Sequence, residues 1–272
     1  PGPACAAIAG HIEEFLVREM REGRVPREFL PLQAGVGDVA NAVIAALGRS
    51  ERIPAFHMYT EVVQDGVIEL MRAGRCLGAS TAALTLSPAC MRGVFAEMDF
   101  FAPRVVLRPQ EISNNAGVVR NLGVITINTV LEMDLAGNAN STHVAGTRLM
   151  NGIGGSADFT RNAGTSILVA PSTAKRGAIS TVVPLCSHID QTEHSVQVLV
   201  TEQGLADLRG LDPWARAELI IERCAHPAYR DALRAYVAAC PPGHVPMHLG
   251  RCFEMHRRFV ETGRMGEGRG GR

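Results

Sequence analysis

The sequence lacks the features that mark several large classes of protein. No apolar run among its 272 residues reaches the ~20 residues that a membrane-spanning helix needs, and no signal peptide is visible. Basic and acidic residues both number 27, so the formal net charge is zero. A balanced charge gives no general attraction to nucleic acid or to an anionic membrane. We therefore expect neither nucleic acid nor a membrane as a partner.

Several catalytic and metal-binding motifs are also missing. The seven cysteines are odd in number, scattered, and form no C-x-x-C pair. This pattern predicts reduced thiols in the core of a cytoplasmic protein. No G-x-S-x-G motif supports a serine hydrolase, and no zinc or iron–sulfur spacing appears. We expect no metal site and no permanently bound cofactor.

Apolar segments that resemble strands alternate with stretches of helical periodicity. Strands are expected at residues 30–33, 56–60, 77–86, 105–107, 123–127, 166–170, 179–183 and 196–200. Helices are expected at 5–22, 39–47, 63–71, 91–98, 213–224 and 229–240. Such alternation is typical of an α/β fold with a mainly parallel sheet flanked by helices. Ligands bind these folds at the carboxyl ends of the strands.

Boundaries along the chain follow from proline, glycine and apolar content. Residues 1–30 read as a linker with a lead-in helix, and residues 31–262 as one domain, although the apolar content would also suffice for two small ones. The tail at 263–272 is expected to be disordered, because it lacks apolar residues that could anchor it.

Two glycine-rich turns could approach a ligand. Gly35-Val-Gly37-Asp38 ends a strand and begins a helix, where backbone amides favour anions. It lacks the third glycine of a dinucleotide fingerprint and the lysine of a P-loop, so a plain turn remains the alternative. The loop Asn151-Gly-Ile-Gly-Gly155 has polar flanks and precedes a probable helix, and its amides could hold an oxyanion or a phosphate.

Three polar segments lie where an α/β enzyme presents side chains to a substrate. Glu61 follows a strand, although Glu61 or Thr60 could instead cap the following helix. Asn114, in Ser-Asn-Asn, could orient a carboxylate or could belong to a turn or an N-cap. Glu202 also follows an apolar strand.

His188 and His194 have acidic neighbours and invite a metal hypothesis. Their six-residue separation fits neither an i, i+4 helical pair nor the H-x₃₋₅-H spacing of zinc sites. A hydrogen-bonded loop is the favoured interpretation.

Taken in order, the motifs resemble the acetyl-CoA hydrolase/transferase family. The similar segments are 31–43, 59–66, 128–135, 140–143, 150–159, 190–194 and 200–210. The succinyl-CoA:acetate and propionyl-CoA:succinate CoA-transferases are the most similar branch. The resemblance implies an NagB/RpiA/CoA-transferase-like domain. It further implies that the chain is the second of two related domains and that the family's N-terminal domain is absent, which agrees with a start at Pro1 rather than Met.

The resemblance also implies a reaction and its residues. A glutamate attacks acyl-CoA to give an anhydride, and the released CoA thiolate then forms a glutamyl-CoA thioester. The implied nucleophile is Glu61, with Asn114 and Glu202 near it and the Gly155 amide serving the oxyanion. The implied contacts with CoA are Val36, Gly37, Asp38, Val39, Ala40, Leu131, Asn151, Gly155 and Lys175. Glu132 also lies in a family-like segment, and we expect it to be structural.

The implied substrates are acyl-CoA and small carboxylates, and the full-length enzyme is expected to be a homodimer. A carboxylate is ionised at pH 7 and needs no general base to attack a thioester. Two alternatives remain open. Water could replace the acceptor acid, which would make the protein an acetyl-CoA hydrolase. Without the other domain, the chain could also be a non-catalytic CoA-binding module.

Overall fold

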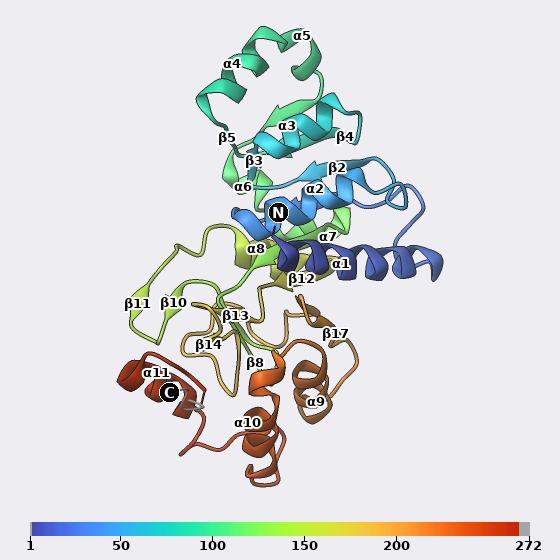
Figure 1. Ribbon diagram of the computed structural model, residues 1–272. Helices are drawn as coiled ribbons and strands as arrows, with labels where there is room; N and C mark the ends of the chain where they lie inside the picture. The colour runs from blue at the N-terminus through green and yellow to red at the C-terminus, as the bar shows by residue number, and fades with distance from the viewer. Residues whose placement is uncertain (1, 267–272) are drawn as a thin grey trace. The chain divides into compact units, whose positions relative to one another are not determined.

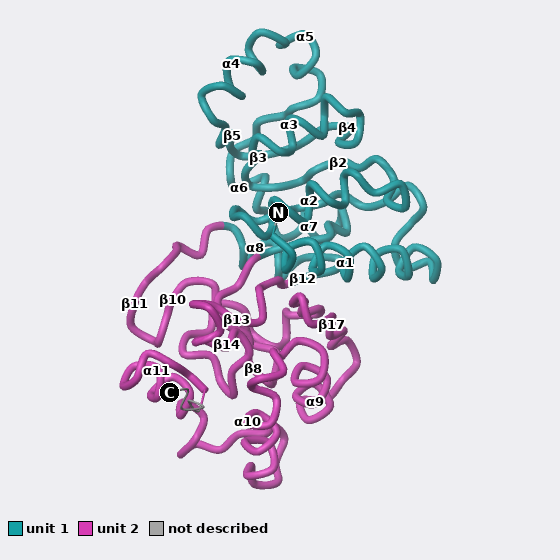
Figure 2. Tube along the Cα trace, viewed as in Figure 1, with its two compact units in different colours: residues 1–128, 155–167 teal, residues 129–154, 168–272 magenta. Residues whose placement is uncertain are grey.

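The computed structural model describes residues 2–266, and its chain divides into two compact units that we describe separately (Figure 1, Figure 2). Unit 1 comprises residues 1–128 and 155–167, and unit 2 comprises residues 129–154 and 168–272. The chain leaves unit 1 within strand β7 (Ile125–Thr129), returns before helix α8 (Ser156–Asn162), and leaves again within strand β12 (Thr165–Val169).

A parallel sheet forms the centre of unit 1. Its strands run in the order β7-β1-β2-β4-β6, and the first residues of β12 lie beyond β7. The further strands are β1 (Leu32–Ala34), β2 (Phe56–Tyr59), β4 (Cys76–Thr81) and β6 (Val105–Leu107). Leu32 pairs with Ile125 on one side and with Met58 on the other. All three residues of β1 are buried, as expected for a parallel strand covered on both faces.

Three helices of unit 1 pack in succession: α1 (Pro3–Arg21), α2 (Asp38–Arg49) and α3 (Asp65–Arg72). Ile8, Ile12 and Leu16 recur at helical spacing on α1 and are fully buried. Gly48 allows the close approach of α2 to α3, because a Cβ there would lie 2.8 Å from Cδ1 of Leu70.

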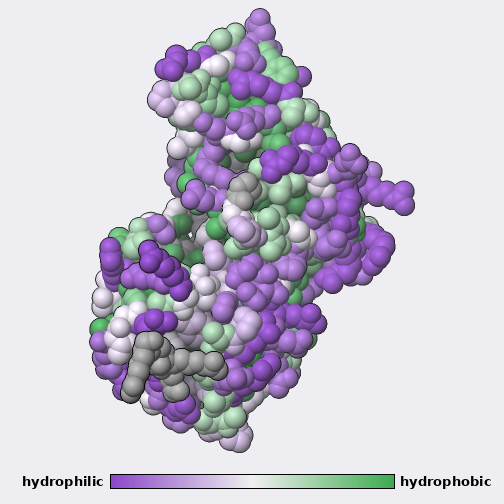
Figure 3. Space-filling view, in the orientation of Figure 1, coloured by the Kyte–Doolittle hydropathy of each residue, from purple (hydrophilic) through white to green (hydrophobic). Residues whose placement is uncertain are grey.

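Unit 1 also contains shorter strands and helices. They are β3 (Val62–Gln64), β5 (Ala83–Thr85), α4 (Pro88–Ala96), α5 (Met98–Phe101), α6 (Gln110–Ser113) and α7 (Ala116–Leu122). Helices α7 and α8 pack on each other, and Tyr59, Val119, Val124 and Phe159 form one buried cluster. Over α4 and α5, hydrophobic and hydrophilic residues alternate at the surface (Figure 3), and Phe95 is 65% exposed.

Unit 2 combines short strands with three helices. The strands are β8 (Glu132–Asp134), β9 (Ala139–Asn140), β10 (His143–Val144), β11 (Arg148–Leu149), β13 (Thr173–Ala174), β14 (Ile179–Ser180), β15 (Val182–Val183), β16 (Val198–Thr201) and β17 (Gly204–Asp207). The helices are α9 (Pro213–Arg223), α10 (Pro227–Ala238) and α11 (Glu254–Thr262). Leu135, Leu199, Ile220 and Leu233 belong to one core that joins the strands to α9 and α10. Asp212 caps α9 by accepting from the backbone N–H of Trp214.

The predicted α/β class and the parallel sheet are confirmed, whereas several local predictions were wrong. The helix predicted at 63–71 begins at Asp65, because Val62–Gln64 pairs with β5 as a strand. The strand predicted at 77–86 is interrupted at Ala82. Helix α11 was not predicted.

The tail was expected to be disordered from residue 263. In its described part, Met265 is buried and its N–H donates to the carbonyl oxygen of Ala178 at 2.8 Å. Met265 is the apolar anchor that this prediction overlooked. Residues 267–272 lie outside the described residues. Between residues 2 and 266, no helix is long and apolar enough to cross a bilayer.

Candidate active site

Glu61 lies in the two-residue link between β2 and β3. Its carbonyl oxygen accepts from the backbone N–H of Ala82 at 2.9 Å and of Ala83 at 3.0 Å, and from Oγ1 of Thr81 at 2.8 Å. Thr60, just before it, is fully buried. The N-cap of α3 is Gln64, which makes no side-chain cap hydrogen bond. The capping interpretation of Glu61 and Thr60 is therefore wrong, and the half-buried Glu61 side chain is available for another purpose.

The backbone amide of Gly155 points at the Glu61 carboxylate. Its N–H donates to Oε2 of Glu61 at 2.7 Å, although the two residues are 94 positions apart. A Cβ on Gly155 would lie 2.5 Å from Nδ2 of Asn114 and closer still to Oε2 of Glu61. Glycine is thus the residue that lets this amide reach the carboxylate. Glu61, Asn114 and Gly155 therefore lie close together within unit 1.

Asn114 and Asn115 have different roles. Asn115 caps α7, because its Oδ1 accepts from the N–H of Gly117 at 3.0 Å and of Val118 at 3.2 Å. Asn114 instead ends α6, and its Nδ2 donates to Oδ2 of Asp158 at 3.0 Å. Asn115 is thus an N-cap and Asn114 a turn residue, so the turn-or-cap interpretation holds for both. The side chain of Asn114 makes the contact with Asp158 in addition.

A further contact fixes the segment that carries Asn114. The hydroxyl of Tyr59, at the end of β2, donates to the carbonyl oxygen of Ile112 at 2.6 Å. Burial raises the pKa of Tyr59 above its usual value, so this phenol stays a proton donor at neutral pH. One end of β2 therefore positions both Glu61, two residues later, and the helix before Asn114.

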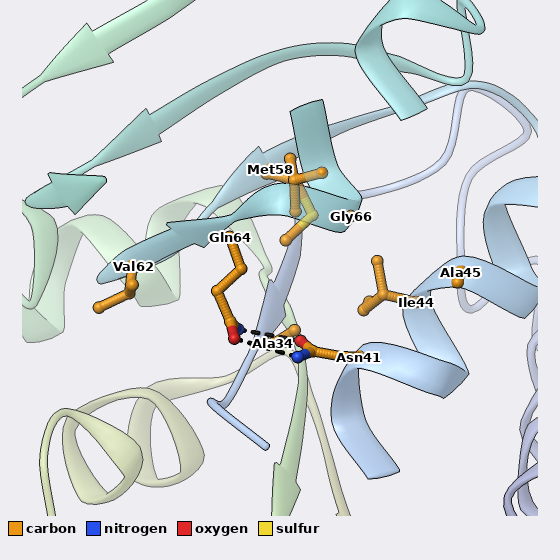
Figure 4. Close-up of a pocket in the computed structure, with 9 residues that line it drawn as sticks. Ala34, Asn41, Ile44, Ala45, Met58, Val62, Gln64 and Gly66 are labelled. Carbon is orange, nitrogen blue, oxygen red and sulfur yellow. Dashed lines mark hydrogen bonds between the residues drawn. The ribbon is translucent and has the colours of Figure 1, made fainter. Parts of the chain in front are cut away.

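Residues 35–37 form the turn that links β1 to α2, and the predicted contacts Asp38, Val39 and Ala40 begin the helix, where Ala40 is fully buried. Val36 is 63% exposed, and Gly37 has a φ of 134°, a conformation that favours glycine. Behind this turn, a small pocket is lined by Ala34, Asn41, Ile44, Ala45, Met58, Val62, Gln64, Gly66 and Val67 (Figure 4). Asn41 and Gln64 exchange two hydrogen bonds of 3.0 and 2.9 Å at its edge (Figure 4). This pair ties the start of α2 to the strand that follows Glu61.

A buried pair of amide side chains lies next to Gly35, at the start of the same turn. Gln33 and Asn128 exchange hydrogen bonds of 3.1 and 3.0 Å between the adjacent strands β1 and β7. Nδ2 of Asn128 also lies 3.4 Å from Oγ1 of Thr160 on α8. A Cβ on Gly35 would lie 2.8 Å from Oδ1 of Asn128. Asn128 thus underlies the turn and contacts the helix that begins after Gly155.

The other predicted CoA contacts, Leu131, Asn151 and Lys175, lie in unit 2. The N–H of Leu131 donates to the carbonyl oxygen of Asn140 at 2.7 Å. Nδ2 of the exposed Asn151 donates to the carbonyl oxygen of Ser141 at 3.2 Å. Lys175, the chain's single lysine, is exposed in the turn between β13 and β14, with its Nζ 5.0 Å from the ring centroid of Phe259.

Glu202 follows β16 in unit 2, where the sequence predicts it. It accepts from the N–H of Ser172 at 2.7 Å, from the Ser172 hydroxyl, and from Nε2 of Gln203 at 3.0 Å. Burial would raise the pKa of Glu202, but these hydrogen bonds outweigh burial and lower it below its usual value. The residue is held as a carboxylate.

Glu132 has the contacts of a structural residue. It is 4% exposed and accepts from Nδ2 of Asn140 at 3.0 Å and from the N–H of Ser187 at 2.9 Å. Nε2 of His256 on α11 lies 2.9 Å from its Oε1. With its oxygens occupied inside unit 2, Glu132 is poorly suited to attack a substrate.

The two histidines of the metal hypothesis make separate contacts. Nε2 of His188 lies 3.3 Å from Oδ1 of Asp190, while the His194 side chain is 84% exposed. Across residues 2–266, no group of three or more potential ligands is placed to hold a metal ion.

Sequence reasoning missed two residues that contact predicted ones: Asp158, beside Asn114, and His256, beside Glu132. The signal for Asp158 was present, since it lies three residues after Gly155 in the first turn of α8. His256 lies on the helix that was not predicted.

Comparison with known proteins identifies relatives of this chain. Residues 91–237, more than half of the chain, match the model of the acetyl-CoA hydrolase/transferase C-terminal domain. The propanoyl-CoA:succinate CoA transferase of Escherichia coli K12 is 56% identical over 97% of this chain and 54% of that protein. The acetyl-CoA hydrolase of Neurospora crassa is 43% identical over 95% of this chain and 51% of that protein.

A solved structure is similar as well. The 4-hydroxybutyrate CoA-transferase from Porphyromonas gingivalis matches with a TM-score of 0.67 and 27% identity, over 87% of this chain and 56% of that chain. The chain spans about half the length of the curated relatives it matches. On the family match and the sequence identities together, this chain belongs to the acetyl-CoA hydrolase/transferase family, as its C-terminal domain.

Proposed function

We propose that this chain is the nucleophile-bearing half of a CoA transferase, in which Glu61 becomes covalently linked to CoA. The observation that carries the proposal is the 2.7 Å hydrogen bond from the Gly155 N–H to Oε2 of Glu61. It places a fixed backbone donor on the carboxylate that would react, at a glycine with no room for a side chain. Similarity to enzymes named CoA transferases supports the same conclusion.

In the first stage, a carboxylate oxygen of Glu61 attacks the thioester carbonyl carbon of acyl-CoA. The new C–O bond forms as the C–S bond breaks, which releases CoA thiolate and leaves an acyl-glutamyl anhydride. The thiolate then attacks the glutamyl carbonyl carbon. A C–S bond forms, the C–O bond to the acyl group breaks, and the free acid departs as a carboxylate.

In the second stage, an acceptor carboxylate attacks the glutamyl-CoA thioester and expels CoA thiolate. The thiolate takes the new acyl group from the resulting anhydride, which restores Glu61. Each attack on the glutamyl carbon places negative charge on a side-chain oxygen. The Gly155 N–H already lies against Oε2, so it can stabilise that charge without reorganisation. One such donor is worth about 3 kcal/mol.

The proposed substrates are acyl-CoA and small carboxylates of the acetate, succinate and propionate class. The name of the 56%-identical relative, a propanoyl-CoA:succinate CoA transferase, supports this class. In unit 1, the exposed Val36 and Asp38 would contact CoA, whereas Ala40 is fully buried. In unit 2, the exposed Asn151 and Lys175 would do so. Remote contacts of this kind supply binding energy for the transition state. We further propose a homodimer of the full-length enzyme and, from seven cysteines that form no disulfide, a cytoplasmic location.

Acetyl-CoA hydrolysis is the second candidate, and the name of the Neurospora crassa relative favours it. In that reaction, water would take the place of the acceptor carboxylate. The nucleophile and the amide donor would keep their roles.

The experiment uses the complete polypeptide that contains this chain, incubated with acyl-CoA and analysed by peptide mass spectrometry. A CoA-sized adduct on the Glu61 peptide, absent in Glu61→Gln, is expected. Glu69→Gln, at an exposed position of α3, is the matched control and should keep the adduct. Thiol release that requires an added carboxylate supports transfer, whereas release without one supports hydrolysis. CoA binding without any adduct would overturn catalysis in favour of a binding module.

A further inference from the structure

Asp158 touches the asparagine that converges on Glu61. Its Oδ2 accepts from Nδ2 of Asn114 at 3.0 Å, across 44 positions of sequence. Nδ2 of Asn114 and Oε2 of Glu61 both border the space above Gly155 that a Cβ would fill. Asp158 is therefore hydrogen-bonded to Asn114, a residue that lies beside the same glycine as the Glu61 carboxylate.

The charge of Asp158 determines how the Asn114 amide is oriented. An ionised carboxylate only accepts hydrogen bonds. The group facing it must be the NH₂ of Asn114, because the amide oxygen would be repelled. Charge-assisted hydrogen bonds are about twice as strong as neutral ones, so one of the two amide orientations is strongly favoured.

The oxygen of the Asn114 amide lies at the other end of the same group. Oδ1 of Asn114 is buried and, within the described part of the chain, has no hydrogen-bond partner. The hydrogen bond to Asp158 is therefore the contact that distinguishes the two ends of this amide.

We propose that Asp158 is a positioning residue, which holds the Asn114 amide in the single orientation that the glutamyl transfer requires. This inference rests on the proposed function of Glu61 and adds a residue to it. Asp158 acts through Asn114, so its removal should matter only while Asn114 is present. Glu61, Gly155, Asn114 and Asp158 all belong to unit 1.

The test is a double-mutant cycle in the complete polypeptide that contains this chain. Asp158→Ala should lower kcat for CoA transfer about tenfold, the loss expected when one hydrogen bond to a charged group is removed. The KM for acyl-CoA should stay within about twofold, because the amide orientation matters in the transition state. Asp158→Asn keeps an acceptor but loses the charge, so its kcat should lie between those of the wild-type protein and Asp158→Ala. In an Asn114→Ala background, Asp158→Ala should cost less than about twofold.

The matched control is Asp99→Asn, which removes the same charge from an exposed position on α5 and should leave kcat unchanged. An equal loss from Asp158→Ala with and without Asn114 would show that Asp158 acts by another route, and would overturn the proposal. An unchanged kcat in Asp158→Ala would overturn it as well.

A second measurement does not depend on activity. In the NMR spectrum of the wild-type protein and of Asp99→Asn, one Asn114 Nδ2 proton should lie well downfield of the other, as a hydrogen-bonded proton does. In Asp158→Ala this difference should collapse. If no adduct forms on Glu61, the proposed function fails while the amide signals still show whether Asp158 orients Asn114. If the adduct forms and the signals do not change, the positioning role alone is wrong.

Discussion

The carboxylate of Glu61 occupies the space into which a side chain at position 155 would point. A Cβ on Gly155 would lie 3.0 Å from Cδ of Glu61 and 2.5 Å from Nδ2 of Asn114. The amide of Gly155 is at the same time a hydrogen-bond donor to Glu61 at 2.7 Å. The close approach of Glu61 to Gly155 and the hydrogen bond between them therefore both depend on the absence of a side chain at position 155.

Gly155→Ala is predicted to lower kcat for CoA transfer by 10²- to 10³-fold, roughly the loss that follows removal of an oxyanion donor. The added methyl must displace Glu61 or Asn114, so the N–H no longer meets Oε2. Steady-state kinetics with acyl-CoA and a carboxylate acceptor would measure the effect.

The control for this change is Gly152→Ala in the same loop, where a Cβ would have nothing within 4 Å. It should retain wild-type kcat. Equal losses in the two variants would indicate general damage to the loop and would contradict a specific role of the Gly155 amide.

Glu132→Gln is predicted to destabilise the fold by about 1–3 kcal/mol, the cost of leaving buried hydrogen-bonding groups without a partner. Burial alone would raise the pKa of Glu132, but hydrogen bonds from His256, Asn140 and Ser187 outweigh it and lower the pKa. The stability from this carboxylate is therefore complete above its ordinary pKa of 4.5 and is lost as pH falls through the lower folded value.

Denaturant titrations between pH 3 and 7 would measure the effect. Wild-type stability should fall in the acid part of that range, and Glu132→Gln should show a smaller fall. The variant should still form the Glu61 adduct under folding conditions. Loss of the adduct in a fully folded variant would contradict a structural role.

The hydrogen-bonded pair Gln33–Asn128 is predicted to contribute more to the stability of the fold than Thr126, which lies on the same strand as Asn128. Asn128→Leu leaves the buried Gln33 amide without its partner, at a cost of about 1–3 kcal/mol. Thr126, two residues earlier on β7, has a buried Oγ1 with no partner among residues 2–266. Thr126→Val should therefore be neutral or stabilising. Chemical denaturation of both variants checks the contrast, and a larger loss in Thr126→Val would refute it.

Lys175→Met is predicted to raise the KM for acyl-CoA several-fold without changing kcat, as loss of a remote phosphate contact would. The single lysine of this chain also allows direct detection, because bound CoA should slow its modification by an amine-directed reagent. Arg234→Met, at an exposed position on α10, is the control for lost positive charge. Unprotected labelling at saturating CoA would remove Lys175 from the binding site.

Local sequence patterns predicted several strands of the sheet, because segments such as Thr165–Val169 and Val198–Thr201 are rich in apolar and β-branched residues. They failed where tertiary pairing overrides the pattern. Val62–Gln64 became a strand because it pairs with β5, not because of its own periodicity. Helix α11 has few apolar residues, and its buried His256 is held by a distant glutamate.

The candidate site was predictable only in part. Strand ends indicated Glu61 and Glu202, and glycines indicated the loop at Gly155. The pairing of Glu61 with Gly155 across 94 positions was predicted from the family resemblance, since no local pattern encodes such a long-range contact. The Asn114–Asp158 contact joins residues 44 positions apart, and although Asp158 follows Gly155 by three residues, no local pattern pairs it with Asn114.

Unit 1 is discontinuous, since the segment 129–154 separates its two parts. During synthesis on the ribosome, Glu61 therefore emerges before Gly155, whose amide donates to it. A chain that ends at residue 128 carries Glu61 without this donor, so segments on both sides of residues 129–154 are needed to complete the hydrogen bond.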